Sequence, residues 1–297
     1  MADHLYISDN DTIKFEYEGK RYCVCIKRDT CGSDPRGDGD NTSIMACWHG
    51  RYKLGDDIGG KSPKEFWNDL VEKYVPDKQF VKQLMADNLL DSHIWPSSGQ
   101  EDEIRAENKL YDFYDLDYSK AEPLGEGIPF SELGKLKCDL SIRDCMTLLQ
   151  EYCEWEPLWL YDHSGLSISA GGGYPYNDRW DSGQVGWAVV RRKDLPDNLS
   201  DHSWRNVADD IIDDETEIYD YYLRDEVYGY TLYEAQSDDS FDPEWEEIEE
   251  SWGFFGDDLA RNGMLDCIPG LFEAVTTDKF ECGTAHKYTV SKTYYEF

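Results

Sequence analysis

Apolar and polar residues alternate along two short stretches near the N-terminus. Residues 13–17 (IKFEY) and 22–26 (YCVCI) both repeat with a period of two, and Glu18-Gly19-Lys20 lies between them. This period places the apolar side chains of a strand on one face, so the pattern predicts a β-hairpin. A polar loop at 29–42 and a strand at 43–49 (SIMACWH) are expected to follow.

Two serines mark the starts of helices in the first half of the chain. Ser62 is followed by Pro63 and by Glu65, the spacing of a capping box with proline in the first helical turn. Ser141 likewise precedes a run in which apolar residues recur every three or four positions. A further helix is predicted at 77–90, after Pro76.

The rest of the chain predicts strands and helices without the regular alternation of a parallel sheet. The expected elements are strands at 158–169 and 183–191 joined by a glycine-rich loop, a helix at 204–226 capped by Ser203, strands at 228–233 and 245–252, a short helix ending near Asn262, and one or two closing strands. We therefore expect an α+β fold of mixed antiparallel sheets, several helices and an inserted arm. The predicted divisions are an N-terminal α+β segment at 1–90, the arm at 91–137 and an acidic α+β domain at 138–297.

The charge of the chain changes this picture most. It has 63 acidic and 29 basic residues, for a formal net charge of −34. Direct binding to nucleic acid needs lysines and arginines facing phosphates, so we expect none. No apolar run is long enough to span a membrane, and the first residues (MADHLYISDN) lack the pattern of a signal peptide. We therefore expect a cytoplasmic protein with reduced thiols and no membrane partner.

One stretch resembles the residues of a hydrolase. Asp162, His163 and Ser164 are consecutive, and Asp181 follows a glycine-rich loop. Consecutive strand residues point to opposite faces, so these three cannot form a relay among themselves. Asp178 or Asp181 returning near His163 leaves open a hydrolase or metal enzyme centred on that histidine. The preferred interpretation is structural, with no catalytic residue and no enzyme activity.

Cofactor and metal motifs are equally weak. Gly171-Gly172-Gly173 matches no phosphate-binding fingerprint. Cys23 and Cys25 would place both sulfurs on one face of a strand, and zinc binding with Cys31 and either Cys47 or His49 is conceivable, but the spacing is not that of a zinc knuckle. We expect no cofactor and no metal, with buried thiols as the preferred reading.

Acidic residues gather in the C-terminal half. The segment from 209 to 258 has 20 carboxylates and one base, Arg224. On the predicted helix the acids lie opposite an apolar stripe made of Trp204, Val207, Ile211, Ile218 and Tyr222. Acids three or four positions apart are about 5–6 Å from one another. We assign partner binding to four of them: Asp209, Asp213, Glu217 and Asp220. A simply solvated helix face and a surface that imitates DNA are the alternatives.

The arm offers aromatic anchors for a protein interface. Tyr111 and Tyr114 alternate with Asp112 and Asp115. Tyrosine is enriched among the residues that dominate binding energies, whereas exposed ion pairs contribute little. We therefore assign these four residues to contacts with a partner or with a second copy of the chain.

Four blocks together resemble an acidic protein family of phages, plasmids and other mobile elements. They are residues 33–56, residues 160–169 (LYDHSGLSIS) with 179–187 (RWDSGQVGW), residues 227–233 (VYGYTLY) and residues 251–258 (SWGFFGDD). In size and acidity the chain also looks like phage-encoded inhibitors of Gabija-type defence. This resemblance implies a homo-oligomer that binds a host defence nuclease complex in the bacterial cytoplasm and blocks its access to DNA, with no chemistry of its own. An anti-restriction DNA mimic is the runner-up.

Overall fold

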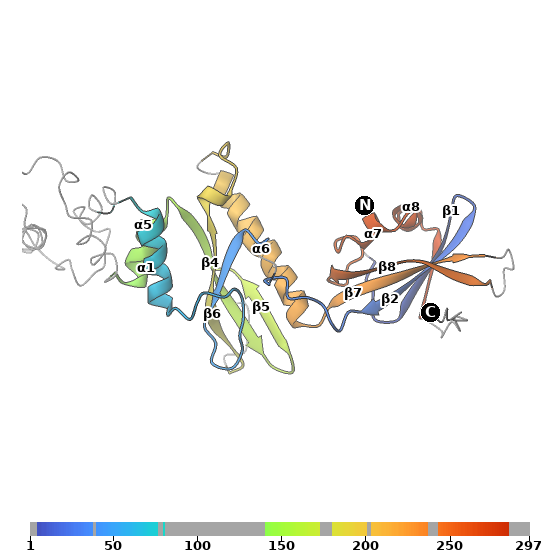
Figure 1. Ribbon diagram of the computed structural model, residues 1–297, viewed down its shortest axis with the longest axis horizontal. Coiled ribbons are helices and arrows are strands. Elements are labelled where there is room, and N and C mark those ends of the chain that lie inside the picture. The colour runs from blue at the N-terminus through green and yellow to red at the C-terminus, as the bar shows by residue number, and fades with distance from the viewer. Residues whose placement is uncertain are drawn as a thin grey trace, which may run out of the picture.

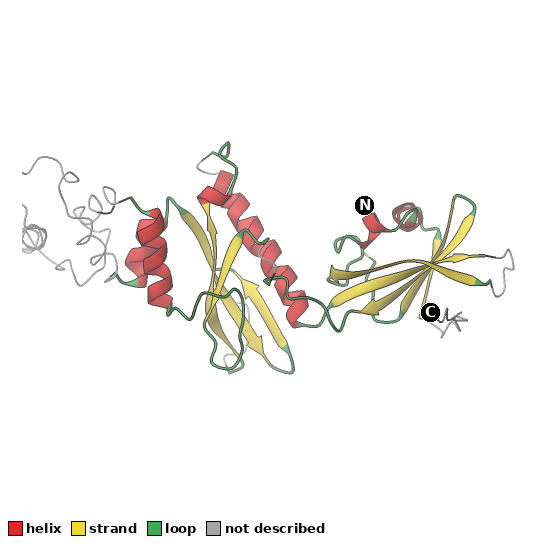
Figure 2. Ribbon diagram, in the orientation of Figure 1, coloured by secondary structure: helices red, strands yellow, loops and turns green. Residues whose placement is uncertain are grey.

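A computed structural model describes residues 5–37, 40–76, 80, 140–172, 180–200, 203–236 and 243–284. These residues form two lobes, each built around one antiparallel sheet (Figure 1). The predicted helix at 77–90, apart from Phe80, and the arm at 91–137 lie outside the described residues. The α+β class predicted from the sequence is confirmed, since helices and antiparallel sheets occur in the same chain (Figure 2).

The five-stranded lobe combines the two ends of the described chain. Its strands run in the order β8-β7-β2-β1-β9, every pair antiparallel. Two short helices, α7 and α8, lie on one face of this sheet (Figure 1). The elements are β1 (Asp11–Tyr17), β2 (Lys20–Arg28), β7 (Val227–Ala235), β8 (Trp245–Phe255), β9 (Phe280–Thr284), α7 (Met264–Cys267) and α8 (Leu271–Thr276).

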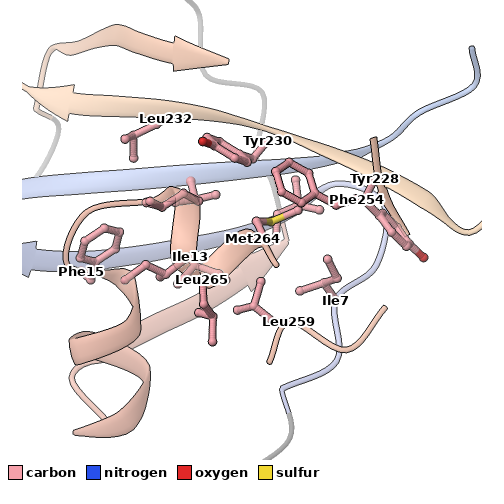
Figure 3. Close-up of a cluster of buried hydrophobic side chains, with 14 of the residues drawn as sticks. Ile7, Ile13, Phe15, Tyr228, Tyr230, Leu232, Phe254, Leu259, Met264 and Leu265 are labelled. Carbon is pink, nitrogen blue, oxygen red and sulfur yellow. The ribbon is translucent and has the colours of Figure 1, made fainter. Parts of the chain in front are cut away.

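The core of this lobe follows from strand register. Ile13 is opposite Val24, and Val24 is opposite Leu232, so these side chains share one face of the sheet. Met264 from α7 packs against that face (Figure 3), as does Leu271 from α8, and both are fully buried. The predicted hairpin at 13–26 is confirmed. An isolated hairpin is marginally stable, and here β7 pairs with the free edge of β2 and stabilises it.

The four-stranded lobe has helices on both faces of its sheet. The strand order is β3-β6-β4-β5, again antiparallel throughout. Helices α1 and α5 pack on one face, and α6 runs along the other (Figure 1). The elements are β3 (Ser43–Cys47), β4 (Cys153–Asp162), β5 (Leu166–Ala170), β6 (Ser182–Arg191), the 3₁₀ turn η2 (Arg192–Asp194), α1 (Pro63–Tyr74), α5 (Ile142–Leu149) and α6 (Ser203–Leu223).

The predicted division into segments 1–90 and 138–297 does not match these lobes and is corrected here. The chain leaves the five-stranded lobe after β2, builds the four-stranded lobe, and returns after α6. Antiparallel pairing of β2 with β7 joins strands that are about 200 residues apart in the sequence. The four-stranded lobe is therefore an insertion in the five-stranded lobe.

The capping box predicted at Ser62 is present, and the helix start predicted at Ser141 is also a capping box. Ser62 Oγ accepts from the Glu65 N–H while the Glu65 carboxylate accepts from the Ser62 N–H, and Ser141 does the same with Asp144. Ser203, in contrast, is the first residue of α6 rather than its cap, and its N–H donates to Ser200 Oγ at 3.2 Å. Reciprocal side-chain bonds thus make the first two helix starts visible from the sequence.

Two other predictions are wrong in detail. The strand expected at 158–169 is a hairpin, in which β4 and β5 are joined through Ser164 (φ +62°) and Gly165 (φ +156°). The short helix expected before Asn262 instead begins after Gly263, whose left-handed φ of +85° supplies the start of α7. None of the described helices is long and apolar enough to cross a membrane.

Candidate functional site

Helix α6 packs one side against the four-stranded sheet. The side chains that become buried recur every three or four residues and are Trp204, Ala208, Ile212, Thr216 and Tyr219. The predicted apolar stripe included Trp204 correctly, but it also included Ile218, whose side chain is 38% exposed. The buried stripe is therefore rotated by about one residue from the predicted one, which changes which carboxylates face solvent.

Beside this stripe lies a group of carboxylates from two elements, which we call the acidic face. Its members are Glu154 and Glu156 on β4, and Asp209, Asp210, Asp213 and Asp214 on α6. Strand alternation explains the contribution of β4. Glu154 and Glu156 occupy the same alternating positions as Leu158 and Leu160, which pack in the core beneath α6. The sheet thus directs two more negative charges towards a helix that is already acidic.

Three carboxyl groups of the acidic face hold their protons more strongly than usual. Burial raises the pKa of Glu156, and the neighbouring charges of Asp209, Glu154 and Asp213 raise it further. The pKa of Asp209 is raised by burial and then by Glu154 and Asp213. Burial, followed by the charges of Asp210 and Asp214, raises the pKa of Asp213. Each ionised group here repels the next.

Little positive charge compensates this repulsion. Arg205 Nη1 lies 2.7 Å from Glu154 Oε2 and acts on one end of the group. Glu156, Asp209 and Asp213 form no ion pair with any lysine or arginine among the described residues. Asp209 Oδ1 is buried and accepts no hydrogen bond from that part of the chain. The arrangement concentrates negative charge at a site that a cation would stabilise.

The four predicted partner-binding acids of the helix fall into two groups. Asp209 and Asp213 belong to the acidic face. Asp220 instead points to β5 and accepts hydrogen bonds from Ser167 Oγ and the Ile168 N–H, both at 2.8 Å.

Glu217 is also engaged within the fold. Its carboxylate lies 2.7 Å from Arg261 Nη2 and accepts a hydrogen bond from Tyr221 at 2.8 Å. Glu217 and Asp220 therefore have partners within the described fold, unlike Asp213, and their assignment to partner binding remains a prediction. The helix turns these two carboxylates towards other parts of the chain.

A second charged network ties the loop between β2 and β3 to α6. The side chain of Arg36 is 1% exposed, and it donates from Nε and Nη2 to the two carboxylate oxygens of Asp56, both at 2.8 Å. Arg36 Nη1 lies 2.9 Å from Glu215 Oε2, and Nη2 also donates to the Ser43 carbonyl. Burial lowers the pKa of Arg36, but the hydrogen bonds and charges of Asp56 and Glu215 outweigh burial and raise it overall.

The residues of the hydrolase hypothesis lie at the β4–β5 turn. His163 Nδ1 is 2.9 Å from Asp181 Oδ2, so Asp181 does return to His163, as the hydrolase alternative requires. Both side chains are open to solvent, with 61% of His163 exposed. Within the described part of the chain, no hydroxyl or thiol hydrogen-bonds to His163 Nε2, the position that a nucleophile would occupy.

Asp162 is not part of this pair. Its carboxylate is 2.5 Å from Arg51 Nη2 and accepts a hydrogen bond from the Tyr52 hydroxyl at 3.2 Å. The Asp162 N–H donates to the Asp181 carbonyl at 2.7 Å, which closes the end of the strand pair. These contacts give Asp162 a structural role at the hairpin and leave His163 with one carboxylate.

The remaining predicted site residues are placed as follows. The arm residues Tyr111, Asp112, Tyr114 and Asp115 lie outside the described residues. Cys23 and Cys25 are on β2, while Cys47 is on β3 in the other lobe, so strand topology separates the conceivable zinc ligands. No group of three or more histidine, cysteine or acidic side chains suited to a metal occurs among the residues described.

Sequence reasoning missed Glu154, Glu156 and the Arg36 network. The signal for the two glutamates was present, since they continue the alternation that ends in Leu158 and Leu160. Nothing local to Arg36 indicated burial, because its partners are 20 and 179 residues away. No protein-family model, curated protein or solved structure matches the chain.

Proposed function

We propose that the chain is a binding protein that uses its acidic face to engage the basic, nucleic-acid-binding surface of a host defence nuclease complex. The target class follows from the resemblance to mobile-element proteins and Gabija inhibitors. The observation that carries the binding mode is the set of three carboxyl groups with raised pKa, those of Glu156, Asp209 and Asp213. Perturbed ionisable groups of this kind gather at functional sites.

A cationic partner would gain from this arrangement in two ways. Repulsion among the carboxylates, which destabilises the free protein, would fall when lysine or arginine side chains enter between them. Long-range attraction would also speed association, because both surfaces carry large charges of opposite sign. The acidic face therefore favours a partner that ordinarily binds phosphates, and the proposed inhibitor would occupy that surface in place of DNA.

Co-purification tests the proposal directly. A tagged chain is expected to retain a Gabija-type nuclease complex at physiological salt and to reduce its cleavage of DNA. The double variant D209N/D213N should bind at least about tenfold more weakly, since close charge pairs at interfaces contribute more than about 1.4 kcal/mol. The matched control is E246Q/E247Q, which removes two exposed charges from β8 in the other lobe.

The outcomes separate the acidic face from overall charge. Equal weakening in both variants would show that only net charge matters, as expected for a general DNA mimic. Unchanged binding in D209N/D213N would overturn the assignment of the acidic face. Failure to retain any such nuclease would overturn the target class.

The homo-oligomer and the role of the arm remain a separate prediction. Y111A/Y114A is expected to weaken assembly, measured by light scattering, more than D210N/D213N does. This control leaves Glu217 unchanged because Glu217 is paired with Arg261. Loss of assembly in the charge variant alone would contradict the assignment of Tyr111 and Tyr114.

The contact between His163 and Asp181 supports a second candidate, a hydrolase centred on this pair. A carboxylate on Nδ1 orients an imidazole that acts as a general base. Under this alternative, His163→Ala abolishes inhibition while the protein stays folded. Under the binding proposal, His163→Ala leaves nuclease retention unchanged, so one variant distinguishes the two functions.

A further inference from the structure

A cavity of about 300 Å³ lies in the four-stranded lobe, beside η2 and the start of α6. Small-molecule sites in proteins begin at about this volume. Six of its lining residues are aromatic or charged, namely Tyr74, Tyr152, Trp204, Arg192, Lys193 and Asp197. The lining thus combines flat rings with basic groups, and it shares no residue with the acidic face or the Arg36 network.

The cavity carries positive charge in a chain whose formal net charge is −34. Arg192 and Lys193 outnumber Asp197 in the lining. Residues 191–193 (RRK) are also the only three consecutive basic residues in the sequence. Asp194 pairs with the first and third of these bases, so two carboxylates accompany three cations. This local excess of positive charge favours an anionic ligand.

Aromatic rings and a backbone hydrogen bond position these cations. The guanidinium carbon of Arg192 lies 5.6 Å from the centre of the Trp204 ring, and Lys193 Nζ lies 5.8 Å from the centre of the Tyr74 ring. The Arg192 N–H donates to the Tyr152 carbonyl at 2.9 Å, which holds the second tyrosine next to the basic run. A ring attracts a cation without neutralising it, so these contacts orient the charges and preserve them.

We propose that this cavity binds a nucleoside phosphate. Tyr74 and Tyr152 are half-buried, so each ring offers part of its surface to a planar base. Stacking on aromatic side chains is a common way to bind a base and tolerates different bases. Arg192 and Lys193 are exposed and supply the charged donors that phosphate oxygens accept. Trp204, which is only 1% exposed, supports Arg192 from below.

The position of the cavity favours a mononucleotide over a nucleic-acid strand. Asp209 of the acidic face is five residues after Trp204 on α6, which is about 7.5 Å along the helix axis. A strand that followed the helix from the cavity would therefore meet carboxylates. The net charge of the chain also repels a polyanion at long range. A single nucleotide carries few charges and places them against the basic run.

Isothermal titration calorimetry with ADP as the probe tests the site. The full chain is expected to bind one equivalent of ADP, and to bind adenosine or pyrophosphate at least about tenfold more weakly, because each keeps only part of the contacts. R192Q/K193Q should weaken ADP binding at least about tenfold. The matched control is K27Q/R28Q, which removes two adjacent exposed bases from β2 in the other lobe and should bind ADP normally.

A second measurement uses the unaltered protein and is independent of how the variants fold. Irradiation with 8-azido-ADP, followed by mass spectrometry, should label peptides that contain Tyr74 or Tyr152. Label confined to the five-stranded lobe would overturn the proposal, as would failure to bind ADP or equal weakening in K27Q/R28Q.

Two further outcomes would assign the cavity to another ligand and so contradict the proposal. Pyrophosphate binding as tightly as ADP would show an anion site that makes no use of the rings. Tighter binding of a single-stranded oligonucleotide than of ADP would show a nucleic-acid site. The proposed contact with a nuclease complex uses the acidic face, so it is tested separately and does not depend on these results.

Discussion

The Arg36 network and the acidic face show two opposite ways in which this acidic chain places carboxylates against α6. Around Arg36, all five guanidinium N–H donors have partners, and Asp56 and Glu215 each share the positive charge. On the acidic face, Glu156 and Asp213 receive no such partner from the described residues, and their pKa values rise. Glu215 from the Arg36 network and Asp209 and Asp213 from the acidic face all lie on α6, within six residues of one another.

This contrast separates structural carboxylates from those available to a partner. Glu215 accepts hydrogen bonds from the Thr42 and Ser43 N–H groups as well as from Arg36, so its charge is fully used within the fold. Asp209, six residues earlier, keeps a buried oxygen without a hydrogen bond from the described chain. Local acidity alone therefore does not distinguish carboxylates that are engaged within the fold from those that have no partner among the described residues.

The largest expected effect comes from removing the cation of the compensated site. Arg36→Met leaves Asp56 and Glu215 partly buried without their counter-charge, which typically costs about 3–5 kcal/mol. Urea unfolding of the two proteins measures this loss. A cost below about 1 kcal/mol would show that the network contributes no more than a surface ion pair.

Neutralising a carboxylate of the acidic face should have the opposite sign. Asp209→Asn keeps the shape of the side chain, removes repulsion with Glu154 and Asp213, and lets the amide donate to a neighbouring carboxylate. We expect a gain of about 0.5–1 kcal/mol in the free energy of unfolding at pH 7, allowing for solvent screening. A loss of stability would contradict the description of this site as repulsive.

The pH dependence of that gain gives a sharper test. The pKa of Asp209 is raised in the folded protein, so its ionised form is destabilising above that pKa, and the penalty disappears as the pH falls through it. The stability difference between Asp209→Asn and the unaltered protein should therefore shrink as the pH is lowered from 7 towards about 4. A difference that stays constant over this range would mean that charge is not its cause.

The smallest effect is expected at the exposed pair between Glu217 and Arg261. Both side chains are open to solvent, with 58% of Arg261 exposed, and such pairs contribute about 0.2–1 kcal/mol. Arg261→Gln should thus lower the free energy of unfolding by less than about 1 kcal/mol, and 1 M salt should remove most of the difference. A larger loss would place Arg261 with Arg36 among the structurally required cations.

Local signals predicted the elements whose stabilising contacts are themselves local. The capping boxes at Ser62 and Ser141 and the hairpin at 13–26 depend on residues within a few positions of one another. The turn at Ser164 was missed although the run Asp162-His163-Ser164-Gly165 interrupts the apolar pattern, because the apolar residues on both sides, Leu160 and Leu166, were assigned to one strand. The backbone of Ser164 and Gly165, both with positive φ, interrupts the extended chain.

The candidate site was only half predictable for a related reason. Asp209 and Asp213 follow from helical spacing, but whether Glu217 and Asp220 face solvent depends on Arg261 and on β5. Those contacts are set by tertiary packing, which shifts the buried stripe of α6 by about one residue. A wide apolar stripe in the sequence does not determine the rotation of a helix about its own axis to within one residue.

The insertion of one lobe within the other imposes an order on synthesis by the ribosome. The N-terminal hairpin emerges first, yet Val24 has no partner on its β7 side until Leu232 has been made. All elements of the four-stranded lobe have been synthesised by the end of α6, so this lobe is able to fold while one edge of β2 still lacks its partner strand. Pairings this far apart in sequence form slowly. The five-stranded sheet is consequently the last part of the protein to assemble, and a released chain that ends after residue 223 would carry a complete four-stranded lobe behind an exposed hairpin.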